Sequence, residues 1–433
     1  MSKKTFTLIV LIILIALGGG YYWFFVRVPS LSVNTGSGSN GSSGNGIFAS
    51  FGQTGQSNSG GKTSASSTNT RSTAPTALAV PALRELSAMP VGGMMSSTTA
   101  STTILRWIDR GTGHIYQAYG DDTAIEEISN TTIPMIYESY WNIPATAFIF
   151  QSLTENSDAV TSFYATLSPA SPVTASTSSS TAQLTPYSLT GSPLPSGTLA
   201  MAISPVSGKT GNQVFTLVKD GSGGATGYVS NFDGTKKTQI FNTPLQQLNV
   251  QWPNANMITL TTKGTAFGTG FLYFINPKTG TFNKIIGGVN GLATLTNNDA
   301  SKVLYSHTNP AGNGMTTSVY NLATGQSQDL PFDTLAEKCF WSRLQTNDLY
   351  CAIPSSIPAA NYPDAWYQGT VSFSDSIWEI DTITGDVHEL VDLTKTARQS
   401  IDAENLELSP TENFIYFVNK KDLSLWSFDL NAI

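Results

Sequence analysis

The residues with the most specific chemistry in this sequence are its two cysteines, Cys339 and Cys351, which flank a predicted β-hairpin centred near Gln345. On two antiparallel strands their Cβ atoms could face each other at the separation that a disulfide requires. In an exported domain this arrangement favours a disulfide, and two separate buried thiols are the alternative. The sequence has no Cys-x-x-Cys pair, so we expect a structural cross-link rather than a redox centre.

Other residue types that could carry chemistry are scattered along the chain. His114, His307 and His388 fall in three different predicted repeats, and no predicted helix brings two of them to metal-ligand spacing. The sequence contains no Gly-x-Ser-x-Gly nucleophile elbow. The segment 111–113 lacks the third glycine and the strand-then-helix context of a dinucleotide-binding loop. We therefore predict no catalytic residue, no metal site and no cofactor.

One predicted loop, from about Pro354 to Ser374, is much longer than its counterparts elsewhere in the chain. Long loops on a rigid scaffold are where binding residues concentrate, and exposed aromatic side chains supply contact area at a low entropic cost. The binding residues predicted in this loop are Tyr362, Asp364, Trp366 and Tyr367. The alternative is that the same rings pack over the face of the folded domain.

The elements that must position these residues follow an all-β pattern from about Val80 onward, where β-branched and aromatic segments alternate with turn residues. One landmark recurs seven times, and in six of the seven copies an aromatic residue stands three positions before the end of a predicted strand. The residues at this position are Tyr116, Tyr164, Tyr228, Tyr273, Ser318, Trp378 and Trp426. Repeats of roughly 45 residues with four short strands predict a seven-bladed β-propeller with four-stranded antiparallel blades.

Turns and a displaced strand complete this prediction. In 276–280, 321–325 and 381–385 an Asn or Asp can cap the turn and a Gly can adopt positive φ, which indicates turn residues rather than calcium ligands. The last repeat ends at Ile433 without a fourth strand. Because Leu83 to Leu86 resembles the fourth strands of other repeats, we predict that it completes blade seven and closes the ring.

The N-terminal segment predicts a membrane helix. Phe6 to Val26 is uncharged and long enough to span roughly 30 Å, the thickness of the hydrocarbon core of a bilayer. Lys3 and Lys4 precede this segment and Arg27 alone follows closely, so the N-terminus is expected in the cytoplasm and the remainder outside. The alternative is a cleaved signal peptide, which also exports the rest of the chain.

The sequence between this segment and the repeats is rich in Ser, Gly and Thr and predicts a flexible tether with a reach of roughly 35 to 40 Å. We therefore divide the chain into a cytoplasmic tail (1–5), a transmembrane signal-anchor helix (6–26), a flexible, disordered linker (27–79) and a β-propeller domain (80–433). The membrane is thus an expected partner through the N-terminal helix.

The composition excludes one class of partner. Only 12% of the 433 residues are charged, with 22 Lys or Arg against 29 Asp or Glu, and the net charge is -7. A face that binds nucleic acid needs clustered Lys and Arg, so we expect no nucleic-acid partner. The 40% hydrophobic content is sufficient for one large core.

The turns 203–205 and 408–410 and the strand 376–381 resemble the WD-repeat and TolB-like β-propeller class over residues 80 to 433. Segments 110–116, 128–134 and 338–341 are also similar to membrane-anchored propeller proteins of candidate-phylum bacteria. These resemblances imply a fold and a location. They imply no activity, because propellers serve as lectins, hydrolases and protein-binding scaffolds alike.

The sequence therefore favours a membrane-anchored extracytoplasmic propeller that acts as a non-catalytic binding or scaffold module for protein or cell-envelope polymer partners. One alternative is a hydrolase or lyase that acts on extracellular glycans, with carboxylates from several blades meeting at the central channel. Such convergence cannot be read from a single chain. A purely structural component of the cell envelope is a further alternative.

Overall fold

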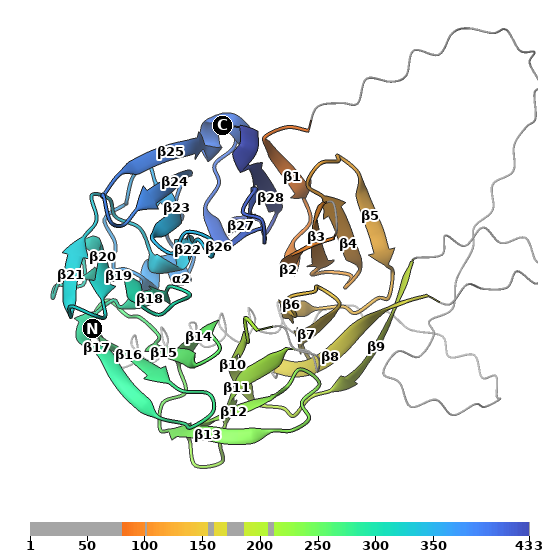
Figure 1. The fold of residues 1–433 in the computed structure, drawn as a ribbon, viewed down its shortest axis with the longest axis horizontal. Helices are drawn as coiled ribbons and strands as arrows, with labels where there is room; N and C mark the ends of the chain where they lie inside the picture. The colour runs from red at the N-terminus through yellow and green to blue at the C-terminus, as the bar shows by residue number, and fades with distance from the viewer. Residues whose placement is uncertain (1–79, 100–101, 155–159, 171–185, 207–211, 433) are drawn as a thin grey trace, which may run out of the picture. The chain divides into compact units, whose positions relative to one another are not determined.

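The computed structural model describes residues 80–99, 102–154, 160–170, 186–206 and 212–432. In this part of the chain the strands form seven four-stranded antiparallel sheets, arranged as blades in a ring (Figure 1). The predicted all-β, seven-bladed propeller is confirmed. The segments predicted as a membrane helix (6–26) and a linker (27–79) lie outside the described residues. Within those residues, no helix is both long enough and apolar enough to cross a membrane.

The first four blades follow one another along the chain, each with its first strand toward the centre of the ring and its fourth at the rim (Figure 1). Blade 1 contains β2 (Val91–Thr98), β3 (Thr103–Asp109), β4 (Ile115–Tyr119) and β5 (Ile125–Ser129). Blade 2 contains β6 (Ile136–Trp141), β7 (Ala147–Leu153), β8 (Val160–Pro169) and β9 (Tyr187–Pro193). Blade 3 contains β10 (Thr198–Ile203), β11 (Gln213–Lys219), β12 (Ala225–Asn231) and β13 (Thr238–Thr243). Blade 4 contains β14 (Leu248–Asn254), β15 (Met257–Thr262), β16 (Thr269–Ile275) and β17 (Phe282–Asn290).

The last three blades carry the short helices as well. Blade 5 contains β18 (Ala293–Thr296), β19 (Lys302–Thr308), β20 (Met315–Asn321) and β21 (Gln326–Asp329). Blade 6 contains β22 (Cys339–Trp341), β23 (Asp348–Pro354), β24 (Asp375–Asp381) and β25 (Val387–Asp392). Blade 7 contains β26 (Ala403–Leu408), β27 (Phe414–Asn419), β28 (Leu425–Asp429) and β1 (Leu83–Ser87). The helices are η2 (Ala336–Lys338), α2 (Asp364–Tyr367), α3 (Leu393–Ala397) and η3 (Leu430–Ala432).

The ring closes as the sequence predicts. Strand β1 pairs antiparallel with β28, with Leu83 opposite Phe428 and Glu85 opposite Trp426. The N-terminal strand thus supplies the outermost strand of blade 7, so the first and last parts of the propeller share one sheet. This pairing covers a row of β28 backbone groups that would otherwise form an open sheet edge.

The core lies between neighbouring blades. Between blades 6 and 7, for example, Ile377, Phe417 and Trp426 belong to one buried apolar cluster. Fully burying side chains of this size stabilises the fold by roughly 1.5 to 3 kcal/mol each. The predicted turns are confirmed too, because Gly280 and Gly385 adopt φ of 69° and 79°.

The connectivity decides which loops lie together. In a four-stranded antiparallel blade, the link between the second and third strands lies at the same end as the link to the next blade. At this end of the blades lie η2, α3 and the long blade-six loop, residues 355–374.

Candidate functional site

A cavity of about 630 Å³ lies against the innermost strands of blades 1, 2, 6 and 7. Its wall includes residues 91–95 of β2, 137–140 of β6, Phe340 of β22 and 404–407 of β26. A volume of this size suits a small molecule or a short polymer segment. The cavity belongs to the centre of the ring, where the first two blades meet the last two.

Three carboxyl groups line this cavity: Glu138 of β6 and both Glu404 and Glu407 of β26. In a regular strand, residues three positions apart point to opposite faces. The pairing of β26 with β27 shifts register between Glu404 and Glu407, and Asn405 in this bulge has a φ of 52°. The extra residue of the bulge explains how both glutamates reach the same cavity.

Burial raises the pKa of all three glutamates. For Glu138, a hydrogen bond from Tyr140 offsets part of the rise. For Glu407, hydrogen bonds from the Ser96 backbone N–H and hydroxyl to Oε1, at 2.8 Å and 2.5 Å, also offset part of the rise. For Glu404, the positive charge of Lys420, 3.5 Å away, opposes the effect of burial. The cavity wall therefore carries carboxyl groups that hold a proton more readily than free glutamates do.

Cations and aromatic rings complete the wall. The Arg110 guanidinium lies 5.2 Å from the centre of the Tyr137 ring, and Arg343 lies 5.5 Å from that of Phe340. Such cation–π contacts stabilise both partners. The cavity thus offers hydrogen-bond donors, acceptors and flat apolar surfaces to a ligand.

Lys420 links this wall to the blade-six loop. Its Nζ lies 4.4 Å from the centre of the Trp366 ring while also pairing with Glu404. Trp366 in turn donates its indole N–H to Asp402, with distances of 3.0 Å and 3.2 Å to the two carboxylate oxygens. The loop therefore packs, through Trp366, against a residue of the cavity wall.

Beside the loop lies a fully buried ionic cluster. The Lys338 ammonium donates to Asp375 at 2.8 Å, to Asp402 at 2.5 Å and to the carbonyl of Ala403 at 2.8 Å. The side chains of Lys338, Asp375 and Asp402 have 0% exposure. Burial raises the pKa of Asp375, although Lys338 opposes this effect.

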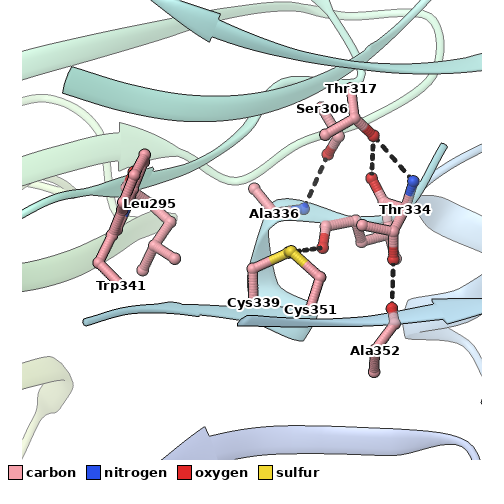
Figure 2. The surroundings of a disulfide bond; sticks show 10 residues. Leu295, Ser306, Thr317, Thr334, Ala336, Cys339, Trp341, Cys351 and Ala352 are labelled. Carbon is pink, nitrogen blue, oxygen red and sulfur yellow. Dashed lines mark hydrogen bonds between the residues drawn. A yellow bond between two sulfur atoms is a disulfide. The ribbon is translucent and has the colours of Figure 1, made fainter. Parts of the chain in front are cut away.

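Hydrogen bonds from two blades hold the segment that presents Lys338 (Figure 2). The Thr334 carbonyl accepts a hydrogen bond from the Thr317 hydroxyl of blade 5, and the Thr334 backbone N–H donates to the same hydroxyl. The Thr334 hydroxyl donates to the Ala352 carbonyl of blade 6 at 2.7 Å. The Ala336 N–H donates to Ser306 at 3.2 Å. These contacts fix η2 between the two blades.

The four residues predicted as an exposed binding surface occupy different environments. Tyr362 and Trp366 have relative exposures of only 1% and 4%, so their expected exposure is wrong. Tyr362 and Trp366 both belong to the apolar cluster that contains Leu335 and Phe373. Trp366 also donates a hydrogen bond to the buried Asp402. The alternative that the sequence left open, packing of the rings over the domain, describes these two side chains.

Asp364 and Tyr367 also make intramolecular contacts. The Asp364 carboxylate accepts from the Ala266 backbone N–H at 2.6 Å, which ties the loop to blade 4. The Tyr367 hydroxyl donates to Glu337 at 2.8 Å. Each of these side chains is only partly buried. A binding role for these residues stays a prediction.

The two cysteines form a disulfide in the structure, across the β22 and β23 pair and with Cα atoms 4.0 Å apart (Figure 2). The three histidines remain in separate blades, and His114 lies 3.2 Å from Glu127. In the described part of the chain, no three His, Cys, Asp or Glu side chains are grouped so as to hold a metal ion.

Sequence reasoning missed the three cavity glutamates and the Lys338 cluster. A signal for part of this group was present: the segment 402–407 places three acidic residues in and beside a strand at the centre of the ring. The partners of Asp402 and Glu407 include Lys338 and Ser96, which come from other blades and carry no local pattern that would identify them.

No protein-family model and no curated protein matches this sequence. Solved structures do match. TolB from Acinetobacter baumannii is 13% identical, with a TM-score of 0.40, over 64% of this chain and 59% of that one. A puromycin-hydrolyzing peptidase from Mycobacterium tuberculosis is 14% identical, with a TM-score of 0.40, over 76% of this chain and 52% of that one. The chain thus spans little more than half the length of these two proteins.

The propeller domain of the Trilobed protease from Pyrococcus furiosus is 9% identical, with a TM-score of 0.47, over 78% of this chain and 95% of that one. The TolB-like propeller class expected from the sequence is therefore represented among the matching structures. At these identities the likeness concerns the fold alone.

Proposed function

We propose that this protein is a membrane-tethered, extracytoplasmic propeller that binds a polypeptide segment of a protein partner in its central cavity. The observation that carries the proposal is the cavity wall, where Arg110, Glu404 and Tyr137 offer a cation, a carboxyl group and an aromatic face within one concave site. A peptide has backbone donors and acceptors as well as apolar side chains, so it can use all three kinds of surface.

The tether and the location rest on the sequence. The uncharged segment 6–26 follows two lysines and precedes the Ser/Gly/Thr-rich segment 27–79, a pattern that supports a single-pass anchor with the propeller outside the cytoplasmic membrane. A disulfide between Cys339 and Cys351 fits an oxidising compartment. Protease digestion of intact cells tests this arrangement, since the propeller epitope should be accessible and an N-terminal tag should be protected.

Panning a displayed random-peptide library against the immobilised full-length protein tests the binding role. Tyr137 lines the cavity and is 51% exposed, so Tyr137→Ala should leave the fold intact. Loss of this ring should weaken selected peptides about tenfold, a change of roughly 1.4 kcal/mol. The matched control is Ile383→Ala, which alters a 69% exposed residue in the turn between β24 and β25. Equal binding by wild type and Tyr137→Ala would show that the cavity is not the peptide site.

A second candidate function follows from the three glutamates. Carboxyl groups with raised pKa values can serve as general acids, and a pair of carboxyl groups in one cavity is the usual requirement for glycoside hydrolysis. Incubation with cell-envelope polysaccharide, followed by assay of new sugar ends, tests this alternative. Turnover that is lost in both Glu404→Gln and Glu407→Gln would favour an enzyme over the binding module.

A further inference from the structure

The buried cluster of Lys338, Asp375 and Asp402 has a composition that a simple ion pair does not explain. Two carboxyl groups face one ammonium group, and all three side chains are fully buried. Burying ions is costly unless every charge is compensated and every polar atom is hydrogen-bonded. Here Asp375 Oδ1 is buried without any hydrogen-bond partner.

The two aspartates differ in their surroundings. Asp402 accepts hydrogen bonds from Lys338, from the Trp366 indole N–H and from the Phe373 backbone N–H, the last at 2.9 Å. The Asp375 Oδ2 atom accepts from Lys338 at 2.8 Å and from the Ala403 backbone N–H at 2.7 Å. Asp402 is thus a fully hydrogen-bonded carboxylate, whereas Asp375 has one oxygen free to carry a proton, in line with its raised pKa.

The rings around the amine keep the cluster apolar. The Lys338 Nζ lies 5.4 Å from the centre of the Trp366 ring and 5.3 Å from that of Phe373. Burial raises the pKa of Asp375, which favours its protonated form. The reactive pair is an amine with a free lone pair and a protonated carboxyl group.

We propose that Lys338 and Asp375 form an intramolecular isopeptide bond, with Asp402 transferring the protons. Lys338 first transfers a proton to Asp375, and its Nζ lone pair then attacks Cγ of the protonated Asp375 and forms the N–C bond. Asp402 accepts a proton from the nitrogen and delivers it to the departing hydroxyl group. The C–O bond breaks and one water leaves, so no oxidant or other reactant is needed. The product is a neutral amide in place of two buried charges.

The bond would act together with the disulfide on one blade. Lys338 directly precedes Cys339, whose disulfide joins β22 to β23, and Asp375 is the first residue of β24. An amide between Lys338 and Asp375 would therefore tie the entry of the innermost strand to the third strand of blade 6. Two adjacent covalent links would hold this part of the cavity scaffold against unfolding and proteolysis.

Peptide mapping of the full-length protein tests the proposal. The cysteines are first reduced and alkylated, because Cys339 and Cys351 would otherwise join the same peptides. Trypsin should then leave residues 303–343 and 344–395 connected, with no cleavage after Lys338 and a mass about 18 Da below the sum, the mass of one water. Lys338→Arg, which keeps the charge without a nucleophilic amine, and Asp402→Asn should both yield separate peptides.

The matched control is Lys420→Arg, which alters a neighbouring lysine paired with Glu404 and should retain the linked peptides. Separate, unmodified peptides from the folded wild-type protein would overturn the proposal whatever the variants do. A link between 303–343 and the peptide 399–420, which contains Asp402, would overturn the assigned roles of the two aspartates.

Discussion

Replacing Trp366 tests whether the blade-six loop is part of the core or a contact surface. Its ring is 4% exposed, and its N–H serves the buried Asp402. A buried indole of about 200 Å² corresponds to roughly 5 kcal/mol at 25 cal/mol per Å², an upper limit because unfolded chains are partly compact. Measured Trp→Ala losses in cores of about 3 to 5 kcal/mol lead us to expect about 4 kcal/mol.

Urea denaturation of the full-length protein, followed by circular dichroism, measures this loss as a lower midpoint. Trp366→Phe separates the two contributions, because it keeps most of the ring and removes the N–H donated to Asp402, at a cost of about 1 to 3 kcal/mol. Tyr137→Ala is the control, since that ring is 51% exposed and its loss should cost under about 1 kcal/mol. A Trp366→Ala protein within about 1 kcal/mol of wild type would refute the assignment of the loop to the core.

Three further predictions concern the scaffold. Burial raises the pKa of Glu407 above its ordinary 4.5, so its stabilising effect is complete below that pH and is lost as the pH rises through the raised pKa. Glu407→Gln should therefore gain stability relative to wild type in urea denaturation as the pH is raised to about 8, whereas a constant difference would contradict the raised pKa. At Gly93, with φ of 145°, a Cβ would lie 2.3 Å from Ser139 Oγ, so Gly93→Ala should lower the free energy of unfolding by about 3 kcal/mol or more. The control Gly385→Ala should cost only about 1 to 2 kcal/mol, because its positive φ is the sole obstacle; equal losses would argue against the close approach of β2 and β6. Removing the disulfide by replacing both cysteines with alanine should cost about 3 kcal/mol for a sequence separation of 12, and a reductant should then destabilise only the wild type.

The propeller could be predicted because its signals are local and repeated. A strand-ending polar residue, an aromatic residue three positions earlier and a Gly at the following turn all lie within a few residues of one another. The closing strand β1 was predictable for a related reason, since the last repeat lacked a fourth strand and a matching segment stood at the other end of the domain.

The candidate site could not be predicted in the same way. Glu138 and Glu404 belong to blades 2 and 7 and meet only when the ring forms. The burial of Trp366 could not be predicted because a long loop with aromatic residues can either expose them as a contact surface or pack them into the core. The deciding partners, Lys338 and Asp402, lie outside the loop and appear only in the fold.

Photocrosslinking at the cavity wall tests the binding role most directly. A photoreactive phenylalanine derivative replaces Tyr137 in the full-length protein in living cells, and a parallel strain carries it at the exposed turn residue Ile383. We predict a discrete protein adduct from the Tyr137 position and none from Ile383. The absence of an adduct at Tyr137, or equal adducts at both positions, would contradict the conclusion that the central cavity binds a protein partner.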